Sequence, residues 1–414
     1  MFRKFIAVLI TFALTFGGIL MLTSCEEKND KITLSIVTTP MSENDYTSKI
    51  PYTVESCDMC FFKPSTQLSP TLAKTAIVLS SSAYNMSVTK DNLKNLGFEK
   101  IKSFNYDLDY DEKTVGITFG TKFVNNTPVI AIVLRGTLAK EWHSNFDIGR
   151  DAKDTLHHAG FNTASEYVMQ MLSEYQKESE LYKTECKYFV TGHSRGGAVA
   201  NLTAKKLIDK AGTNNVYAYT FASPNTTLDK NVHNTEYSGI FNFVNSEDFI
   251  AFVPLESWGF QKYGTTKHLL TDTSDEKYEE KLNHVSEKYK QYKNRELKTY
   301  GGTEKLSKFL EDAHSLAPTV DDYYNKKYEI LSDEMSVYDF MDMVAELLNN
   351  ENILSNGMII LNCDGTAFES IKNFMMLGMD SDTALVPNYN DSLISYTHSA
   401  ESYLCFLEVY LSDM

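Results

Sequence analysis

The sequence predicts an α/β fold in which helices cover both faces of a mostly parallel sheet. Three short runs rich in aromatic and β-branched residues are typical of buried strands: Lys187–Thr191, Val216–Phe221 and Ile240–Asn245. Helical or loop segments separate these runs, and such alternation implies parallel strands. A length of 414 residues suits one large domain with additions.

The remaining elements are expected on both sides of these strands. Ser69 and Pro70 predict a helix start, because Ser is a good N-cap and Pro suits the first helical position. Residues 114–123 and 128–134 are rich in β-forming residues, and the four residues between them indicate a hairpin. Residues 161–175 carry apolar side chains three and four positions apart, which predicts an amphipathic helix.

The composition excludes several classes of protein. Acidic residues number 55 against 39 basic ones, which gives a net charge of -16. We therefore expect no nucleic-acid partner, since that requires basic surface. Apolar residues make up 43% of the chain, enough for a globular core. The sequence has no fixed repeat, which argues against a solenoid or propeller.

The first residues predict export. Arg3 and Lys4 precede an apolar run, Phe5–Leu22, and Cys25 follows two small residues. This order is typical of an export signal. Leu22–Cys25 resembles the lipobox of bacterial lipoproteins, which implies a diacylated Cys25 and anchoring at the outer face of a bacterial cytoplasmic membrane. An uncleaved membrane anchor is the alternative, because the run is nearly long enough to span.

The other five cysteines cannot all pair within one chain, because their number is odd. Cys57 and Cys60 form a CxxC, but zinc needs four ligands and no second pair exists. The context also lacks the strand and helix of a redox site. We expect either a local disulfide or two idle thiols here. Cys186, Cys363 and Cys405 lie in apolar contexts and are predicted to be small core residues.

The segment Lys187–Ala200 contains a G-x-S-x-G pattern between a predicted strand and a predicted helix. Ser194 needs a tight turn to hold its hydroxyl clear of the sheet, and only Gly at 192 and 196 avoids clashes there. The helix that follows points backbone N–H groups at a developing oxyanion. An ordinary glycine-rich turn is the alternative, and the flanking strand and helix argue against it.

Seven segments, in order, resemble those of the class 3 (fungal-type) lipases of the α/β-hydrolase fold. They are Ile132–Thr137, Trp142 with Asn145 and Phe146, His158–Phe161, Gly192–Gly197, Thr220–Pro224, Val244–Asp248 and His398–Leu404. The resemblance spans residues 67–270 and 392–410. Each segment alone is a weak signal, whereas seven in order are specific.

The resemblance implies a role for each matching residue. Ser194 matches the nucleophile, Asp248 the triad acid and His398 the general base. Thr137 and the backbone amide of Arg195 match the oxyanion hole. The order Ser, acid, His agrees with the α/β-hydrolase order.

Other residues compete for the acid and base roles. Glu247 adjoins Asp248, but neighbours at a strand end point apart, so only one can meet the histidine. His268 follows Asp248 by 20 residues, which is short for the return to the nucleophile. His193 cannot fold back onto Ser194 and is expected to pack near the turn. Two further histidines lie in charged helices and are expected at the surface: His284 and His314.

The chain departs from the family pattern in three places. Phe249–Ala251 stands where a Pro is usual, and Ala222 stands where Gly is usual. The largest departure is the 150 residues between Asp248 and His398. Most of the excess lies in residues 272–380, which are helical, charged and Met-rich in character. Because the ends of this segment flank the acid and the base, we expect it to form a cap.

The sequence therefore divides into four predicted parts. Residues 1–24 form a lipoprotein signal peptide, and residues 25–66 form a tether with an irregular N-terminal segment. Residues 67–271 and 381–414 form an α/β-hydrolase domain, with a mostly parallel central sheet flanked by helices. Residues 272–380 form a helical insertion before the catalytic histidine.

The resemblance implies a serine ester hydrolase at the cell surface that acts on carboxylic esters, with lipid esters favoured, and needs no metal or cofactor. A phospholipase, a small-ester esterase or an acyltransferase could use the same triad. A binding lipoprotein that kept the fold without turnover is an alternative of another class. The sequence does not set the acyl chain length, the head group or the oligomeric state.

Overall fold

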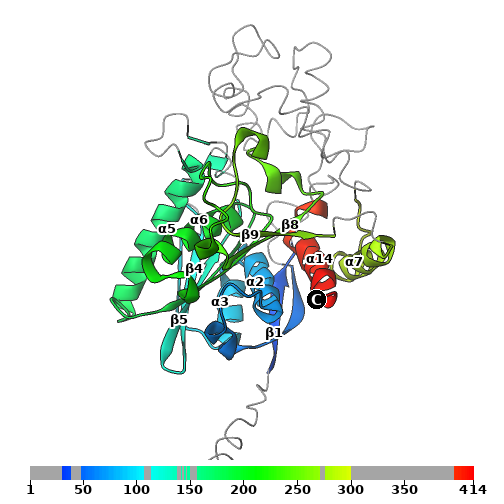
Figure 1. Ribbon diagram of the computed structural model, residues 1–414. Coiled ribbons are helices and arrows are strands. Elements are labelled where there is room, and N and C mark those ends of the chain that lie inside the picture. Colours follow the sequence, from blue (N-terminus) through cyan, green and yellow to red (C-terminus); the bar gives the residue numbers. More distant parts are fainter. Residues whose placement is uncertain are drawn as a thin grey trace, which may run out of the picture.

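A seven-stranded mixed sheet forms the centre of the protein (Figure 1). The computed structural model describes residues 30–38, 48–106, 113–137, 141, 144–145, 147–149, 156–270, 276–299 and 396–414. In sheet order the strands are Glu99–Phe104 (β3), Ile117–Val124 (β4), Thr127–Leu134 (β5), Lys187–His193 (β6), Val216–Phe221 (β7), Ile240–Asn245 (β8) and Thr265–Leu269 (β9). Strands β5 to β9 are parallel, while β3 and β4 extend the sheet antiparallel. The predicted mostly parallel α/β sheet is confirmed.

The β4–β5 hairpin turns through Asn125 and Asn126, whose φ angles are 48° and 62°. Asparagine tolerates this left-handed conformation, which a two-residue hairpin turn requires at both positions. Val124 pairs with Thr127, so the strands extend into the predicted four-residue connection. The turn lies at the amino end of β5, the edge of the sheet at which the parallel strands begin.

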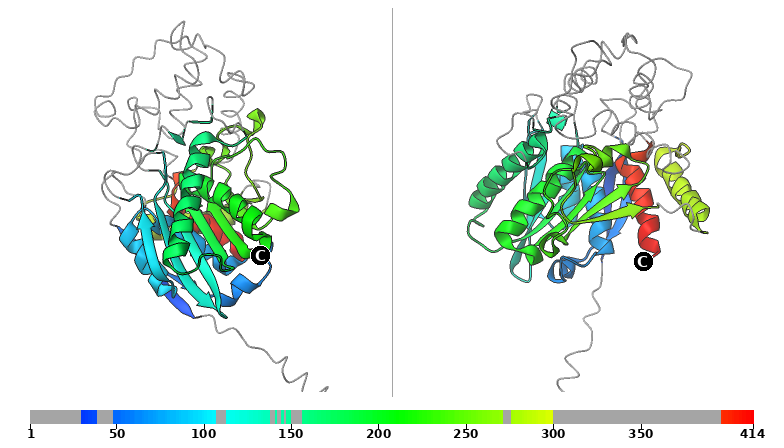
Figure 2. Two further views of the ribbon diagram at one scale, coloured as in Figure 1. Left: turned by 90° about the vertical axis from the view of Figure 1, so that its left-hand side faces the viewer. Right: turned by 45° about the horizontal axis from the view of Figure 1, so that its top comes forward.

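Helices cover both faces of the sheet (Figures 1 and 2). On one face lie Ala159–Glu178 (α5) and Arg195–Ala211 (α6); on the other lie Pro70–Ser82 (α2), Met86–Asn95 (α3), Tyr278–Lys293 (α7) and Ala400–Ser412 (α14). Strand β5 shows why both layers are needed. Ile130, Ile132 and Leu134 belong to the first core, and the alternating residues from Val129 belong to the second. Both faces of the strand are apolar, as expected for a parallel sheet between helices.

The prediction of irregular structure in residues 26–66 is wrong for part of that segment. Lys31–Val37 (β1) and Lys49–Glu55 (β2) pair antiparallel and pack against α2 and α3. Asn92 of α3 closes the free edge of β1, since its side chain bonds both the N–H and the C=O of Ser35 at 2.8 Å. The two strands have an alternating burial pattern, although the sequence did not predict strands here.

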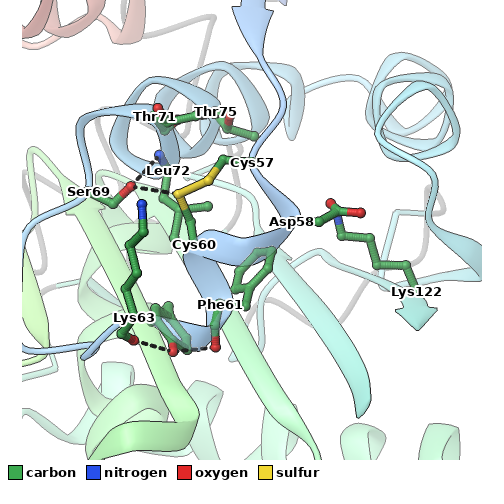
Figure 3. The surroundings of a disulfide bond; sticks show 11 residues. Cys57, Asp58, Cys60, Phe61, Lys63, Ser69, Thr71, Leu72, Thr75 and Lys122 are labelled. Atoms are coloured by element: carbon green, nitrogen blue, oxygen red, sulfur yellow. Dashed lines mark hydrogen bonds and ion pairs between the residues drawn. A yellow bond between two sulfur atoms is a disulfide. The ribbon is translucent and has the colours of Figure 1, made fainter. Parts of the chain in front are cut away.

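Cys57 and Cys60 form a disulfide beside the short 3-10 helix Asp58–Phe62 (η1) (Figure 3). The Ser69 hydroxyl lies 3.5 Å from the Cys60 sulfur and accepts a hydrogen bond from the backbone N–H of Leu72. Of the two alternatives left open by the sequence, the local disulfide is therefore confirmed. The thiols of Cys186 and Cys405 are free and buried, as predicted, while Cys363 lies outside the described residues.

Residues 276–299, which include α7, are the described part of the predicted insertion. Residues 272–275 and 300–380, and with them most of the predicted cap, lie outside the described residues. The α7 residues Val285 and Tyr289 are fully buried in the same core as α14. Three lysines on α7 pair with acids on α14 or at its C-cap: Lys281 with Asp413, Lys288 with Glu408 and Lys293 with Glu401. These pairs define an antiparallel contact between the helices. Within the described part of the chain, no helix is both long and apolar enough to cross a membrane.

Candidate active site

Ser194 lies on a sharp turn between β6 and α6. Its φ and ψ angles are 58° and -129°, a conformation that non-glycine residues rarely adopt. The backbone N–H of Ser194 donates to the carbonyl of Phe221 on the neighbouring strand at 3.0 Å. The turn therefore sits at the carboxyl edge of the parallel strands, where α/β folds place their ligand sites.

The two flanking glycines leave no room for side chains. A Cβ on Gly192 would lie 2.2 Å from the carbonyl oxygen of Gly196. A Cβ on Gly196 would lie 2.5 Å from the carbonyl oxygen of Leu134. Both clashes involve backbone atoms, which cannot rotate away. The steric reason for the G-x-S-x-G pattern thus holds in the structure.

Ser194, His398 and Asp248 form one chain of hydrogen bonds. His398 Nε2 lies 2.9 Å from Ser194 Oγ, and His398 Nδ1 lies 2.8 Å from Asp248 Oδ2. The carboxylate only accepts, so Nδ1–H donates to it and Nε2 accepts from the serine hydroxyl. All three residues are buried. His398 lies 150 positions from Asp248 and 204 positions from Ser194 in the sequence, and the structure brings the three side chains together.

The competing residues lie elsewhere. Asp248, not Glu247, bonds the histidine. His268 is exposed and stacks on Phe252, and His284 is exposed on α7. His314 lies outside the described residues.

Tyr403 of α14 holds the Asp248 carboxylate in place. Its hydroxyl donates to Asp248 Oδ2 at 2.7 Å and accepts from the backbone N–H of Asn245 at 3.0 Å. Burial, then the nearby Asp248 charge, raises the pKa of Tyr403 well above its usual value, so the hydroxyl stays a donor. The backbone N–H of Ile250 donates to the other carboxylate oxygen at 3.1 Å. Tyr403 belongs to the family-like segment His398–Leu404, but no role for it was predicted.

His193 connects the serine turn to the histidine. Its Nδ1 lies 3.0 Å from the hydroxyl of Tyr84, and its Nε2 lies 2.6 Å from the carbonyl oxygen of His398. Burial lowers the pKa of His193 well below its usual value, so the ring is neutral. A neutral ring that donates from Nε2 to the carbonyl accepts at Nδ1 from Tyr84. His193 therefore packs at the turn, as predicted, and also bonds the backbone of His398.

Arg195 organises the loop that carries Thr137. Its guanidinium donates to Asn145 Oδ1 at 2.8 Å, and Asn145 Nδ2 donates to Thr137 Oγ1 at 2.9 Å. It also donates to Ser144 Oγ at 2.9 Å and to the carbonyl of Thr114 at 3.0 Å. Burial lowers the pKa of Arg195 to about 10, so it remains charged at neutral pH. The two residues predicted for the oxyanion hole are thus linked through one side chain, Asn145.

The segment around His398 is held from several sides. Asn245 Nδ2 donates to the carbonyl of Thr397 at 3.0 Å. Lys293, at the end of α7, forms a 2.7 Å ion pair with Glu401, and both side chains are almost fully buried. The Arg295 guanidinium lies 4.1 Å from the ring centre of Tyr396. Lys293 at the end of α7 and Arg295 just beyond it therefore contact residues on both sides of His398.

A family model described as Lipase (class 3) matches residues 131–258, which include Thr137, Ser194, Arg195 and Asp248 but not His398. None of the curated proteins matches the sequence.

Several solved lipase structures are similar to part of the chain. One is a triacylglycerol lipase whose catalytic centre is described as a serine protease triad (21% identity, 52% of this chain, 80% of that chain, TM-score 0.36). A second is the Rhizomucor miehei triacylglyceride lipase (20% identity, 49% and 80%, TM-score 0.36). A third is lipase II from Rhizopus niveus (23% identity, 49% and 81%, TM-score 0.36).

Proposed function

We propose that the protein is a serine ester hydrolase with Ser194 as nucleophile, His398 as general base and Asp248 as the orienting acid. The observation that carries this proposal is the buried hydrogen-bond chain Asp248–His398–Ser194, with lengths of 2.8 and 2.9 Å. Such a chain activates a hydroxyl whose own pKa is too high for nucleophilic attack. The match of residues 131–258 to the class 3 lipase family favours lipid esters as substrates.

In the first half-reaction, Ser194 Oγ attacks the ester carbonyl while His398 Nε2 takes the hydroxyl proton. The backbone N–H of Arg195, at the start of α6, and Thr137 hold the resulting oxyanion. Removal of one such donor typically costs about 3–4 kcal/mol of barrier. The protonated His398 then gives its proton to the leaving alcohol, which leaves an acyl group on Ser194.

In the second half-reaction, His398 takes a proton from water, and the hydroxide formed attacks the acyl group. Collapse of this second intermediate releases the acid and returns the proton to Ser194. Asp248 stays ionised throughout and stabilises the charged imidazole. Tyr403 supports this state, because its hydroxyl donates to the same carboxylate oxygen.

We further propose that the mature protein begins at a diacylated Cys25 and is held outside a bacterial cytoplasmic membrane. The lipobox-like segment Leu22–Cys25 motivates this proposal. The Cys57–Cys60 disulfide supports it, since disulfides persist in oxidising compartments outside the cytosol.

Turnover of a panel of esters tests the proposed activity. We expect hydrolysis of carboxylic esters by the purified protein, and a loss of about 10⁴- to 10⁶-fold in kcat for Ser194→Ala. His284→Ala, at an exposed histidine, should leave the rate unchanged and controls for His398→Ala. Esters of increasing chain length, together with phospholipids, identify the substrate class. Turnover by the Ser194→Ala variant at the parental rate would contradict the mechanism.

A further inference from the structure

We propose that the edge of the sheet opposite Ser194 docks on the anchoring membrane, so that the active site faces away from that membrane. The docking face consists of Met59, Phe62, Phe123 and Tyr182. This inference rests on the proposed lipid anchor at Cys25, and it adds the direction from which the substrate arrives.

The described chain begins at the edge opposite Ser194. The carbonyl of Asp30 accepts from the backbone N–H of Ser56 at 2.8 Å, next to the disulfide turn. Just beyond that turn, the carbonyl of Lys63 accepts at 2.8 Å from Tyr217 near the start of β7. Asp30 therefore lies near the amino ends of the parallel strands, whereas Ser194 follows the carboxyl end of β6. Figure 1 shows β1 on the side of the molecule opposite the loops that follow β8.

The tether between the anchor and the folded body is short. Cys25 and Asp30 are separated by five residue steps, which span at most about 18 Å when fully extended. The seven residues of β6 alone extend about 23 Å from one edge of the sheet to the other. If Ser194 faced the anchoring membrane, the body would be inverted and Asp30 would lie farther from that membrane than the tether reaches. A short tether thus fixes which edge meets the lipid.

That edge exposes large apolar side chains. Phe123, at the β4–β5 hairpin, is 61% exposed, and Tyr182, in the loop before β6, is 54% exposed. Met59 and Phe62 of η1 are 37% and 39% exposed. Such side chains are favourable at a lipid surface and unfavourable in water.

Lysines accompany two of these rings. Lys187 Nζ lies 5.3 Å from the ring centre of Phe62. Lys177 and Lys183 lie 5.7 and 5.6 Å from the ring centre of Tyr182. Long lysine side chains can cover apolar surface while their ammonium groups reach the polar headgroups. Glu178, Glu180 and Glu185 lie in the same region, so docking depends on apolar contact and the tether rather than on net charge.

The disulfide gives part of this face a fixed shape. Met59 lies between the two cysteines in the sequence, and Phe62 follows them at the end of η1. Cys60 and Phe61 are buried, which leaves Met59 and Phe62 on the outer side of the turn. Asn125 Nδ2 donates to Met59 Sδ at 3.3 Å, so η1 and the hairpin that carries Phe123 are in contact.

This orientation restricts the substrate. Lipids of the anchoring membrane lie beneath the docking face and do not reach Ser194. The enzyme then acts on esters that approach from the opposite side, either dissolved or carried by another surface.

Hydrolysis by the lipid-anchored protein in phosphatidylcholine vesicles tests the orientation. Two forms are compared: the natural tether, and a form with about 30 Gly and Ser residues inserted between Asn29 and Asp30, long enough to allow inversion. We expect both forms to cleave a water-soluble ester at equal rates. A fluorogenic ester lipid in the same vesicles should be cleaved at least about tenfold faster by the long-tether form. Equal rates on the embedded lipid would overturn the proposal.

Quenching by brominated phosphatidylcholine tests the docking face itself. The tryptophan introduced by Phe62→Trp should fluoresce in addition to Trp142 and Trp258, and brominated lipid should quench its fluorescence. The tryptophan introduced by Leu156→Trp should not be quenched. Leu156 is 42% exposed and precedes α5 beside the active-site loops, which makes it a matched control at the opposite edge. Equal added quenching at the two positions, or an unmodified Cys25 by mass spectrometry, would overturn the proposal. The water-soluble ester reports separately on the proposed activity.

Discussion

The serine side of the site, Gly192–Gly196, and the histidine side, Tyr396–Glu401, are built in different ways. On the serine side, a strand, two glycines and a helix follow one another directly, and the geometry is set by contacts within that turn and with the adjacent strand end. On the histidine side, the chain is positioned by residues far away in sequence, among them Asn245, His193 and Lys293. The comparison shows that local geometry can be encoded by a motif, whereas the position of the base depends on tertiary contacts.

Helix α7 accounts for part of this difference. The chain reaches His398 only after residues 272–380, so the position of His398 depends on contacts with elements that are distant in the sequence. The α7 end and Arg295 just beyond it supply contacts at Tyr396, two residues before His398, and at Glu401, three residues after it. We expect these contacts to limit the motion of the histidine backbone.

The largest effect is expected on the serine side, from Gly192→Ala. The new methyl would meet the backbone carbonyl of Gly196 at 2.2 Å, so the turn cannot form as observed. We expect loss of soluble folded protein, or destabilisation above about 4 kcal/mol, measured by chemical denaturation. Gly97→Ala is the control, because Gly97 has a positive φ, which strains any side chain, but no atom within 4 Å of its Cβ position. It should cost only about 1–3 kcal/mol, and an equal cost at the two sites would contradict the steric account.

On the histidine side, Lys293→Met should destabilise the protein by about 3–5 kcal/mol, because Glu401 would keep its charge in a buried site without this partner. The rate at which Ser194 reacts with a fluorophosphonate should fall about tenfold, with little change in KM for an ester. Replacing both Lys293 and Glu401 by Met should restore part of the stability.

Lys281→Met is the control on the same helix. Its partner Asp413 is 48% exposed at the far end of α14, and an exposed pair contributes at most about 1 kcal/mol. If Lys281→Met and Lys293→Met slow the labelling of Ser194 equally, α7 does not position the histidine.

A smaller effect is expected from Tyr403→Phe, which keeps the ring and removes the hydroxyl that donates to Asp248. We expect kcat to fall about tenfold at constant KM, and stability to fall by about 1–3 kcal/mol. Tyr410→Phe on the same helix should leave kcat unchanged. If Tyr403→Phe keeps the parental kcat, the other hydrogen bonds to Asp248 are enough to position its carboxylate.

The smallest effect is expected on the pH dependence of stability, through Lys262, which bonds the loop after Asp248. Lys262 Nζ donates to Asn225 Oδ1 at 2.8 Å and to the carbonyl of Ala251. Burial lowers the pKa of Lys262 from 10.5 to about 8. Between these values the unfolded chain binds more protons, so the free energy of unfolding contributed by Lys262 rises with pH. From pH 8 to pH 9.5 we expect a gain of about 1–2 kcal/mol relative to Lys262→Met, measured by denaturation at both pH values. A pH-independent difference would contradict the buried ammonium.

Much of the fold was predictable from the sequence because it depends on local pattern. The strands at 187, 216 and 240 begin at the predicted residues, and Ser69 caps α2 as expected. Ala222 has a φ of 52°, a conformation that favours glycine. This explains why glycine is usual at this position in the family pattern from which the chain departs.

The missed features depend on contacts between distant segments. Strands β1 and β2 alternate in burial only because α2 and α3 cover one side of them. Tyr84 and Lys293 lie near the site through tertiary packing, and nothing in their local sequence marks them. Tyr403 lies in a family-like segment, but its bond to Asp248 depends on the packing of α14. The meeting of Ser194 with His398 could be anticipated only from the resemblance, since 204 positions separate them.

Mass spectrometry of the protein after reaction with a fluorophosphonate, combined with the labelling rate, tests most directly whether Ser194 and His398 act together. We expect one adduct, on Ser194, and a labelling rate that falls by about 1,000-fold or more in His398→Ala but not in His284→Ala. An adduct on another residue, or a rate that His398→Ala leaves unchanged, would contradict the joining of the two sides into one catalytic site.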